Sequence, residues 1–385
     1  MGVEQPLFLH EDVLPAIPSG WVWSRSDSLV IQRKPGKLFD TKTVAATGAV
    51  PVLNQSEIGV LGYHDEEPGV VASAGAPVVT FANHTCAMRL VKYPFSAIQN
   101  IFPKVGKQGE CDTVWFYYAL LGRVRTNEYK GHHPLFRDAF VPVPPLAVQR
   151  RIASILSAYD DLIENSTRRI AILEEMARRI YEEWFVRFRF PGHEGVRMVE
   201  SELGLVPEGW SLRRLGDEIE LAYGKALKAE DRRLGDVPVY GSSGVVGAHD
   251  LSLVAAPGII VGRKGNVGSV HWSEVPFFPI DTVYYVVTDL PLHYVYFNLQ
   301  RQNFLNNDAA VPGLNRNQAY SLPLIVPARG VLDGFEGHCR HLLGLARLLA
   351  RKNDNLRATR DLLLPKLISG ELDVSVVPEP EALAA

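Results

Sequence analysis

The sequence predicts an α+β protein in which two tandem α/β domains alternate with two long helices that pair as an antiparallel coiled coil. Three observations predict this fold class: an internal repeat, two heptad patterns in one phase, and short apolar runs between turn residues. Residues 18–21 (Pro-Ser-Gly-Trp) return as 207–210 (Pro-Glu-Gly-Trp). A period of about 183 to 189 residues is too long for a solenoid and fits a duplicated domain-plus-helix unit with pseudo-twofold symmetry.

Each repeat ends in a heptad pattern, with seam residues alternately four and three positions apart. The second pattern follows the first by 183 residues without a change of phase. One exposed apolar stripe does not stabilise an isolated helix, so we expect the two helices to pack on each other. The predicted seam consists of Ile152, Leu156, Tyr159, Ile163, Ser166, Ile170, Leu173, Ala177, Ile180, Trp184, Phe335, Cys339, Leu342, Ala346, Leu349, Asn353, Leu356, Arg360, Leu363 and Leu367.

A pseudo-dyad would make the helix pairing antiparallel and would fix its register. It sets three pairs of seam residues opposite each other: Ser166 and Asn353, Tyr159 and Arg360, Trp184 and Phe335. A buried polar pair lowers stability but fixes register. The alternative is that both segments are ordinary amphipathic helices of one large domain.

The apolar runs read as short strands because β-branched residues alternate with Gly- and Pro-containing turns. Examples are residues 78–81, 258–261 and 283–287, with short helices predicted near 114–121 and 292–306. The predicted segments are a first head (1–143), a first spacer helix (144–190), a linker (191–204), a second head (205–331), a second spacer helix (332–373) and a flexible tail (374–385).

Composition limits the class of protein. A chain of 385 residues with 46% apolar residues has room for two to three folded domains. It has no run of 18 apolar residues and no signal-peptide pattern, and its three scattered cysteines fit free thiols. We therefore expect a cytoplasmic protein without a metal site and without a membrane partner.

Several motifs together resemble the specificity subunit of a type I restriction-modification enzyme. They are the Pro-x-Gly-Trp openings, residues 144–156 around the start of the first helix, residues 188–192 (Phe-Arg-Phe-Pro-Gly) and residues 364–372. The resemblance covers essentially the whole chain. It implies two target-recognition domains, each reading one half of a bipartite, asymmetric sequence in double-stranded DNA.

The resemblance also implies the partners. The spacer helices would dock two methyltransferase (modification) subunits, which restriction (translocase-nuclease) subunits join in some systems. The chain itself would be non-catalytic and hold no cofactor. S-adenosylmethionine would be bound by the methyltransferase subunits, and ATP with Mg²⁺ by a restriction subunit. The alternatives are a methylation-only system and a coiled-coil scaffold that reads no DNA.

Three loops of the second head carry candidate DNA contacts. Residues 261–268 form a Gly-flanked turn, in which glycine permits close approach to a groove while Arg pairs with guanine and Asn with adenine. A solvated β-turn is the competing interpretation. The candidates are Arg263, Lys264, Gly265 and Asn266 in this turn, Asn315, Arg316, Asn317 and Gln318 in a second loop, and Ser242 and Ser243 in a third.

The first head differs at the corresponding place. Alignment through Ala76-Pro77 and Ala256-Pro257 sets Asn83-His84-Thr85-Cys86 against residues 263–266, so a cationic turn becomes a neutral one. This difference predicts two unlike half-sites. The candidate contacts here are Asn83, His84, Arg89 and Lys92.

The chain has 40 cationic and 43 anionic side chains. Because neutralisation of phosphates dominates DNA affinity, this balance argues against a protein that binds DNA tightly without partners. The resemblance accommodates this if methyltransferase subunits supply much of the phosphate contact. Motifs of a methyltransferase, a metal-dependent nuclease or a P-loop enzyme are not found. Paired charges on the outer helix faces, among them Glu174-Glu175 and Arg178-Arg179, are either solvated or a docking surface.

Overall fold

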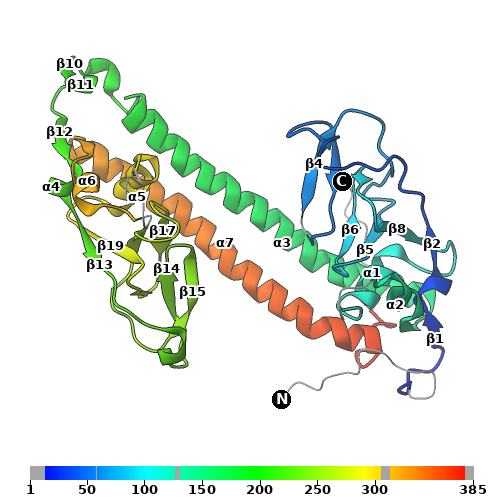
Figure 1. Ribbon diagram of the computed structural model, residues 1–385. Coiled ribbons are helices and arrows are strands. Elements are labelled where there is room, and N and C mark those ends of the chain that lie inside the picture. The colour runs from blue at the N-terminus through cyan, green and yellow to red at the C-terminus, as the bar shows by residue number, and fades with distance from the viewer. Residues whose placement is uncertain (1–13, 58, 126–130, 305–312, 378–385) are drawn as a thin grey trace. The chain divides into compact units, whose positions relative to one another are not determined.

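The computed structural model describes residues 14–57, 59–125, 131–304 and 313–377 (Figure 1). The chain forms two compact units: unit 1 comprises residues 1–166 and 352–385, and unit 2 comprises residues 167–351. Each unit contains one head and part of both long helices, α3 (Leu146–Tyr181) and α7 (Arg329–Ser369). The units therefore divide within the helices, whereas the predicted segments divide between head and helix. Residues 1–13 of the predicted first head, 305–306 of a predicted helix and 378–385 of the predicted tail lie outside the described residues.

The first head is built from three small sheets. A four-stranded sheet has the order β2-β8-β5-β6, a three-stranded sheet has the order β4-β3-β7, and β1 pairs with β9. Its elements are β1 (Val22–Arg25), β2 (Val30–Gln32), β3 (Val50–Leu53), β4 (Val60–His64), β5 (Val78–Ala82), β6 (Met88–Val91), β7 (Ser96–Ala97), β8 (Ile101–Gly106), α1 (Thr113–Leu120), α2 (His133–Asp138) and β9 (Phe140–Val143).

The second head repeats this topology, with sheets β13-β19-β16-β17 and β15-β14-β18 and the pair β12-β20. In both heads the three-stranded sheet contains one parallel pair, β3 with β7 and β14 with β18. The internal repeat is thus confirmed. The elements are β12 (Ser211–Arg214), α4 (Leu215–Glu218), β13 (Ile219–Tyr223), β14 (Val237–Gly241), β15 (Gly244–His249), β16 (Gly258–Gly262), β17 (Val270–Ser273), β18 (Phe278–Pro279), β19 (Val283–Thr288), α5 (Leu292–Arg301), α6 (Arg316–Tyr320) and β20 (Pro323–Val326).

Continuous apolar runs become the inner strands of the four-stranded sheets. Strands β5 and β16 are buried at every position and have a neighbour on each side. A strand covered on both faces needs no polar alternation, which explains why these two runs were recognisable from sequence.

The repeated Pro-x-Gly-Trp motif forms the same turn in both units. The Trp21 and Trp210 amides donate to the carbonyls of Pro18 and Pro207, each at 3.1 Å. The glycine between has φ of +82° or +85°, which favours glycine at that position. In unit 1 the turn lies against Gly370 at the end of α7, and in unit 2 Trp210 packs on Phe190 after α3.

The long helices pair in opposite directions within each unit. In unit 1, Leu367 shares a core with Ile152, and the Asn353 side-chain amide lies 3.4 Å from the Ile163 carbonyl. In unit 2, the Phe335 ring lies 6.2 Å from Trp184. None of the predicted seam residues is exposed. The antiparallel coiled coil of the predicted fold class is confirmed.

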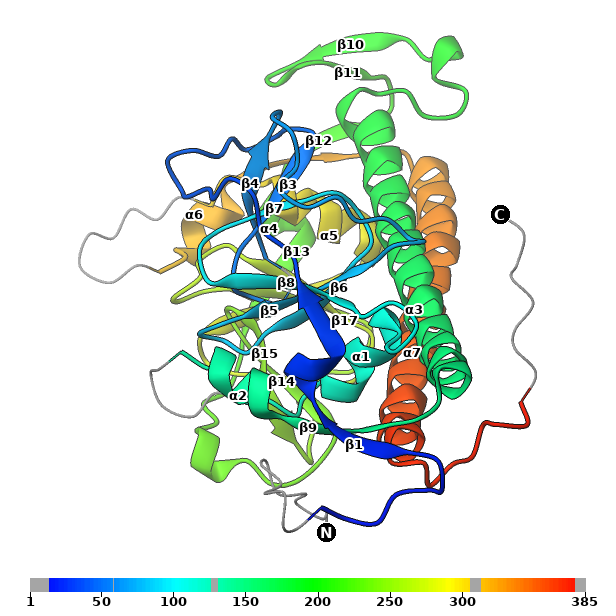
Figure 2. The same ribbon diagram turned by 90° about the vertical axis from the view of Figure 1, so that its right-hand side faces the viewer.

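The segment after α3 departs from a plain linker. A π-helical turn (Glu182–Val186) follows α3, and Phe188 has a positive φ of 58°. A hairpin of β10 (Met198–Ser201) and β11 (Gly204–Pro207) then lies beyond the end of α3 (Figure 2). No helix in the described part of the chain is both long and apolar enough to cross a membrane.

The register of the helix pair is testable through its polar seam residues, Ser166 and Asn353, which are 5% and 2% exposed. We expect the double variant Ser166→Cys/Asn353→Cys to form a disulfide under mild oxidation, because facing seam positions bring Cα atoms into the roughly 4.4–6.8 Å range that a disulfide needs. Non-reducing electrophoresis after proteolysis between the positions reports the link. Each single variant is the control, and a double variant that stays reduced would contradict this register.

Candidate nucleic-acid interface

The tip loop of the second head (residues 263–266) is held by backbone bonds at the end of β16. The Arg263 and Lys264 amides both donate to the Thr282 carbonyl, at 2.9 and 3.0 Å. A Cβ on Gly262 would lie 2.1 Å from the Asn266 carbonyl oxygen, and Gly265 has a φ of +78°. Glycine is therefore required for a tight turn here, which leaves Lys264, Gly265 and Asn266 exposed.

A second loop, residues 313–318, lies directly beside the tip loop. The Leu314 amide donates to the Arg263 carbonyl at 2.8 Å, and Lys264 pairs with Gly313. Asn315 caps α6 by accepting hydrogen bonds from the amides of Asn317 and Gln318, at 3.0 and 3.2 Å. The structure thus places the second of this head's three candidate clusters beside the first.

Two arginines from these loops flank one aromatic ring. The guanidinium carbons of Arg263 and Arg316 lie 5.0 and 5.1 Å from the centroid of Tyr223, which is 49% exposed. Such cation–π contacts restrict a flexible side chain. Arg263 is restrained further because its Nη1 donates to the Asp281 carbonyl at 2.9 Å. Within residues 14–57, 59–125, 131–304 and 313–377, no carboxylate forms an ion pair with Arg263, Lys264 or Arg316.

A second tyrosine, Tyr284, lies in the core beneath these loops and contacts both of them. The Tyr284 hydroxyl lies 3.5 Å from the Leu314 carbonyl, and Arg263 also lies 5.9 Å from the Tyr284 ring. Burial raises the pKa of Tyr284, so this phenol stays neutral at physiological pH. Tyr223 was not among the residues predicted from sequence; a tyrosine at a strand end beside Gly224 is a weak signal by itself.

The third candidate cluster contributes to the shape of the tip. The Ser242 hydroxyl accepts a hydrogen bond from the Asn266 amide at 3.3 Å, and its carbonyl lies 3.1 Å from His271 Nε2. Ser242 therefore positions the tip loop, whereas Ser243 beside it is exposed.

In the first head the corresponding loop is held by the same kind of backbone hydrogen bonds but carries different side chains. The Asn83 amide donates to the Asn100 carbonyl, and the His132 amide donates to the Asn83 carbonyl, both at 2.9 Å. These bonds repeat those that hold Arg263. The His84 amide donates to Gln55 Oε1 at 3.0 Å, as the Asn266 amide does to Ser242.

The other two candidates of the first head are engaged within unit 1. Arg89 donates to the backbone carbonyls of Asn54 at 2.7 Å and Gly59 at 3.0 Å, and so holds the loop between β3 and β4. Lys92 forms a 2.8 Å ion pair with Asp161 on α3. Both side chains therefore maintain the head, and neither lies free at its tip.

Comparison with known proteins relates this chain to one group. No family model matches it. The type I restriction enzyme MjaIX specificity subunit of Methanocaldococcus jannaschii is 26% identical over 331 residues, 74% of each protein. The HindI specificity subunit of Haemophilus influenzae is 20% identical over 313 residues, 60% of this chain and 68% of that one. This chain is a relative of type I restriction enzyme specificity subunits.

The fold agrees with that relationship. The crystal structure of a type I restriction-modification S subunit from M. genitalium matches with a TM-score of 0.63 and 18% identity, covering 91% of this chain and 96% of that one. Within this fold, the two heads share the backbone hydrogen bonds that hold the tip loop and differ in the side chains at the tip. Among the described residues no group of three His, Cys, Asp or Glu side chains is placed to hold a metal ion.

One half-buried histidine supports the tip of the first head. His133 stacks on Phe102 with ring centroids 3.9 Å apart, and its amide donates to Asn83 Oδ1 at 2.9 Å. Burial, with Lys104 and Arg137 nearby, lowers the pKa of His133 to about 4. The imidazole is therefore neutral at physiological pH.

This shift predicts a pH dependence of stability. Because the folded pKa of His133 lies below the unfolded value of about 6.5, its contribution is fully present above about pH 6.5 and is lost as the pH falls toward 4. The variant His133→Phe keeps a stacking ring and removes the titration. Urea unfolding at several pH values should show a smaller loss of unfolding free energy for the variant between pH 6.5 and 4. Identical pH profiles for the two proteins would contradict the assignment.

Proposed function

We propose that this chain is the sequence-specific DNA-recognition subunit of a type I restriction-modification complex, in which each head reads one half of a bipartite, asymmetric target. The supporting observation is a common backbone frame that presents unlike side chains. Arg263 and Lys264 occupy the tip of one head, and Asn83 and His84 occupy the tip of the other. Two heads with the same backbone arrangement but different tip side chains are suited to bind DNA in the same way and to recognise different sequences.

The second head offers the chemistry of base readout. A restrained arginine is suited to a bidentate contact with guanine O6 and N7. Lys264 is exposed, and a cation in that position suits a phosphate oxygen. We propose Arg263 and Arg316 as base or phosphate contacts and Asn266 as an adenine contact. In the first head we propose His84, with Asn83 as a residue that shapes the tip.

The remaining functions of the complex belong to partners in this proposal. Two methyltransferase subunits dock on α3 and α7 and bind S-adenosylmethionine, and a restriction subunit, where one is present, binds ATP with Mg²⁺. The chain itself performs no catalytic step. Since its anions outnumber its cations, 43 to 40, those subunits also supply much of the phosphate contact.

Exchange of one head tests whether the chain reads DNA. Replacing residues 14–143 with the corresponding head of a homologous subunit should change one half of the methylated sequence and leave the other half unchanged. Genome-wide mapping of methylated adenines measures both halves. A scaffold that reads no DNA would leave the map unaltered, and that result would reject the proposed function.

Single substitutions at the tip test the roles of its two cations. We expect Arg263→Ala to lose about 1–3 kcal/mol of binding to the target and to relax specificity at one base pair. Lys264→Ala should weaken binding to all sequences alike and lower the salt slope by about 1. The measurement is DNA affinity of the assembled complex against salt concentration.

Arg213→Ala is the matched control, because this exposed cation of the same head is paired with Glu218 at 3.0 Å. It should alter neither specificity nor the salt slope. Equal effects of all three substitutions would argue that the tip loop does not contact DNA.

A further inference from the structure

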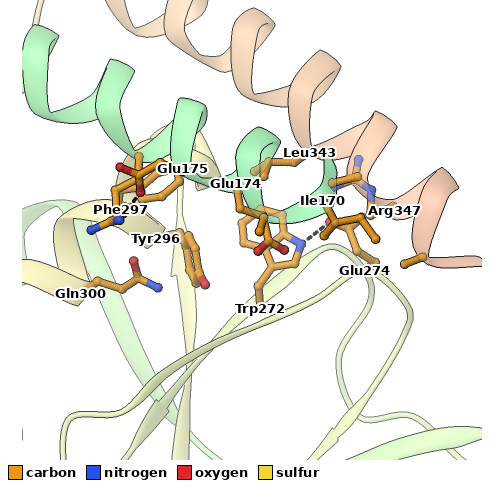
Figure 3. A pocket seen from close by; sticks show the side chains of 14 residues that line it. Ile170, Glu174, Glu175, Trp272, Glu274, Tyr296, Phe297, Gln300, Leu343 and Arg347 are labelled. Carbon is orange, nitrogen blue, oxygen red and sulfur yellow. Dashed lines mark hydrogen bonds and ion pairs between the residues drawn. The ribbon is translucent and has the colours of Figure 1, made fainter. Parts of the chain in front are cut away.

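Unit 2 contains a cavity of about 490 Å³ whose purpose the DNA-reading surface does not explain. Its lining comes from α3, α7, β17 and α5, all within the same unit. Trp272 of β17 and Tyr296 of α5 project into the same space as Glu174 of α3 (Figure 3). The aromatic rings form an edge-to-face pair with centroids 5.5 Å apart. The cavity therefore combines aromatic surfaces with a carboxylate.

Most charged groups around this cavity already have partners. Glu274 forms an ion pair with Arg347 and accepts a hydrogen bond from the Trp272 indole. Glu175 is paired with Arg178 and, at 2.7 Å, with Arg179. Glu174, by contrast, forms no ion pair with any residue that the structure describes. The cavity thus contains one carboxylate without a cation.

The internal repeat shows what fills the corresponding place in unit 1. Helices α1 and α5 follow the corresponding strands β8 and β19, and aligning Thr113 with Leu292 sets Tyr117 and Tyr118 against Tyr296 and Phe297, with the same burial at six of the eight aligned positions. The 183-residue shift of the seam makes Arg360 the counterpart of Ala177 and Asp160 the counterpart of the lining residue Leu343. These pairs relate the lining residues Tyr296, Phe297 and Leu343 to Tyr117, Tyr118 and Asp160 of unit 1.

In unit 1 this place is occupied by an arginine of the chain itself. Arg360 forms an ion pair with Asp160, which also accepts a hydrogen bond from the Tyr118 hydroxyl. Only 22% of the Arg360 side chain is exposed. In unit 2 the counterpart of Arg360 is Ala177, a buried core residue without a charged group, and the counterparts of Asp160 and Tyr118, which are Leu343 and Phe297, line the cavity.

We propose that this cavity of unit 2 receives the guanidinium group of an arginine on a docked methyltransferase subunit. The inference rests on the proposed docking of that subunit. His293 stacks on one face of the Trp272 ring, so a planar cation would contact the remaining aromatic surface of Trp272 and Tyr296, and Glu174 offers a carboxylate for its N–H donors. Arginine is the residue that unit 1 uses at the corresponding place. A centrally buried arginine is also a frequent energetic centre of protein interfaces.

A small-molecule probe tests the cavity without any partner. The full chain should bind Nα-acetylarginine methylamide, detected by saturation-transfer NMR, and should not bind the neutral isostere Nα-acetylcitrulline methylamide. Glu174→Gln should weaken binding of the arginine probe at least about fivefold, since the charged acceptor is lost. Glu220→Gln, which alters an exposed carboxylate of the same unit outside the cavity, should leave it unchanged. Equal binding of the arginine probe by the wild type and Glu174→Gln would overturn the proposal.

The assembled complex tests the occupant. Co-purification and titration with methyltransferase subunits should show about tenfold weaker association for Glu174→Gln and no change for Glu220→Gln. If Glu174→Gln associates as the wild type does while head exchange still redirects methylation, the cavity inference fails and the proposed function stands. If the wild-type chain associates with no methyltransferase subunit, the docking part of the proposed function fails, and the occupant proposed here fails with it.

Discussion

The two heads depend on the long helices to complete their hydrophobic cores. In unit 2 the head strands share one core with Tyr181 at the end of α3, with Phe185 in the π-helical turn after it, and with Phe335 near the start of α7. In unit 1 the start of α3 contributes Ile152 and the end of α7 contributes Leu367. Since burial of large apolar side chains is the main stabilising contribution, neither head is expected to keep its fold without the helix ends. This sharing places the division between compact units inside the helices.

The same constraint explains the repeated openings of the two heads. Trp210 packs on Phe190 just after α3, and Trp21 packs beside Gly370 just after α7. Each tryptophan thus joins the start of a head to the end of a long helix. A tight turn with glycine at positive φ precedes both tryptophans, which is why the motif combines proline, glycine and tryptophan at fixed spacing.

Both units join the head to a long helix by an ion pair at a similar place, but the charges are exchanged. Lys92 follows β6 in the first head and pairs with Asp161 on α3. At the corresponding place after β17, Glu274 pairs on α7 with Arg347, three residues beyond Gly344, the counterpart of Asp161, so that the signs are reversed. The tips vary in the same manner, because Arg263 and Asn83 make the same backbone bonds while their side chains differ. Such differences preserve the backbone arrangement and change which groups each unit can contact.

The sequence by itself determined the repeat, the heptad seam and the buried strands, because these are periodic patterns in local sequence. It also identified the tip loop through glycines that a tight turn requires. Only the tertiary structure decided that Arg316 and Tyr223 lie beside Arg263, since strand order brings distant segments together. It also assigned Arg89 and Lys92 to contacts within unit 1. The physical reason is that the partner of a long cationic side chain depends on which loops and helices the fold places within its reach, and local sequence does not contain that information.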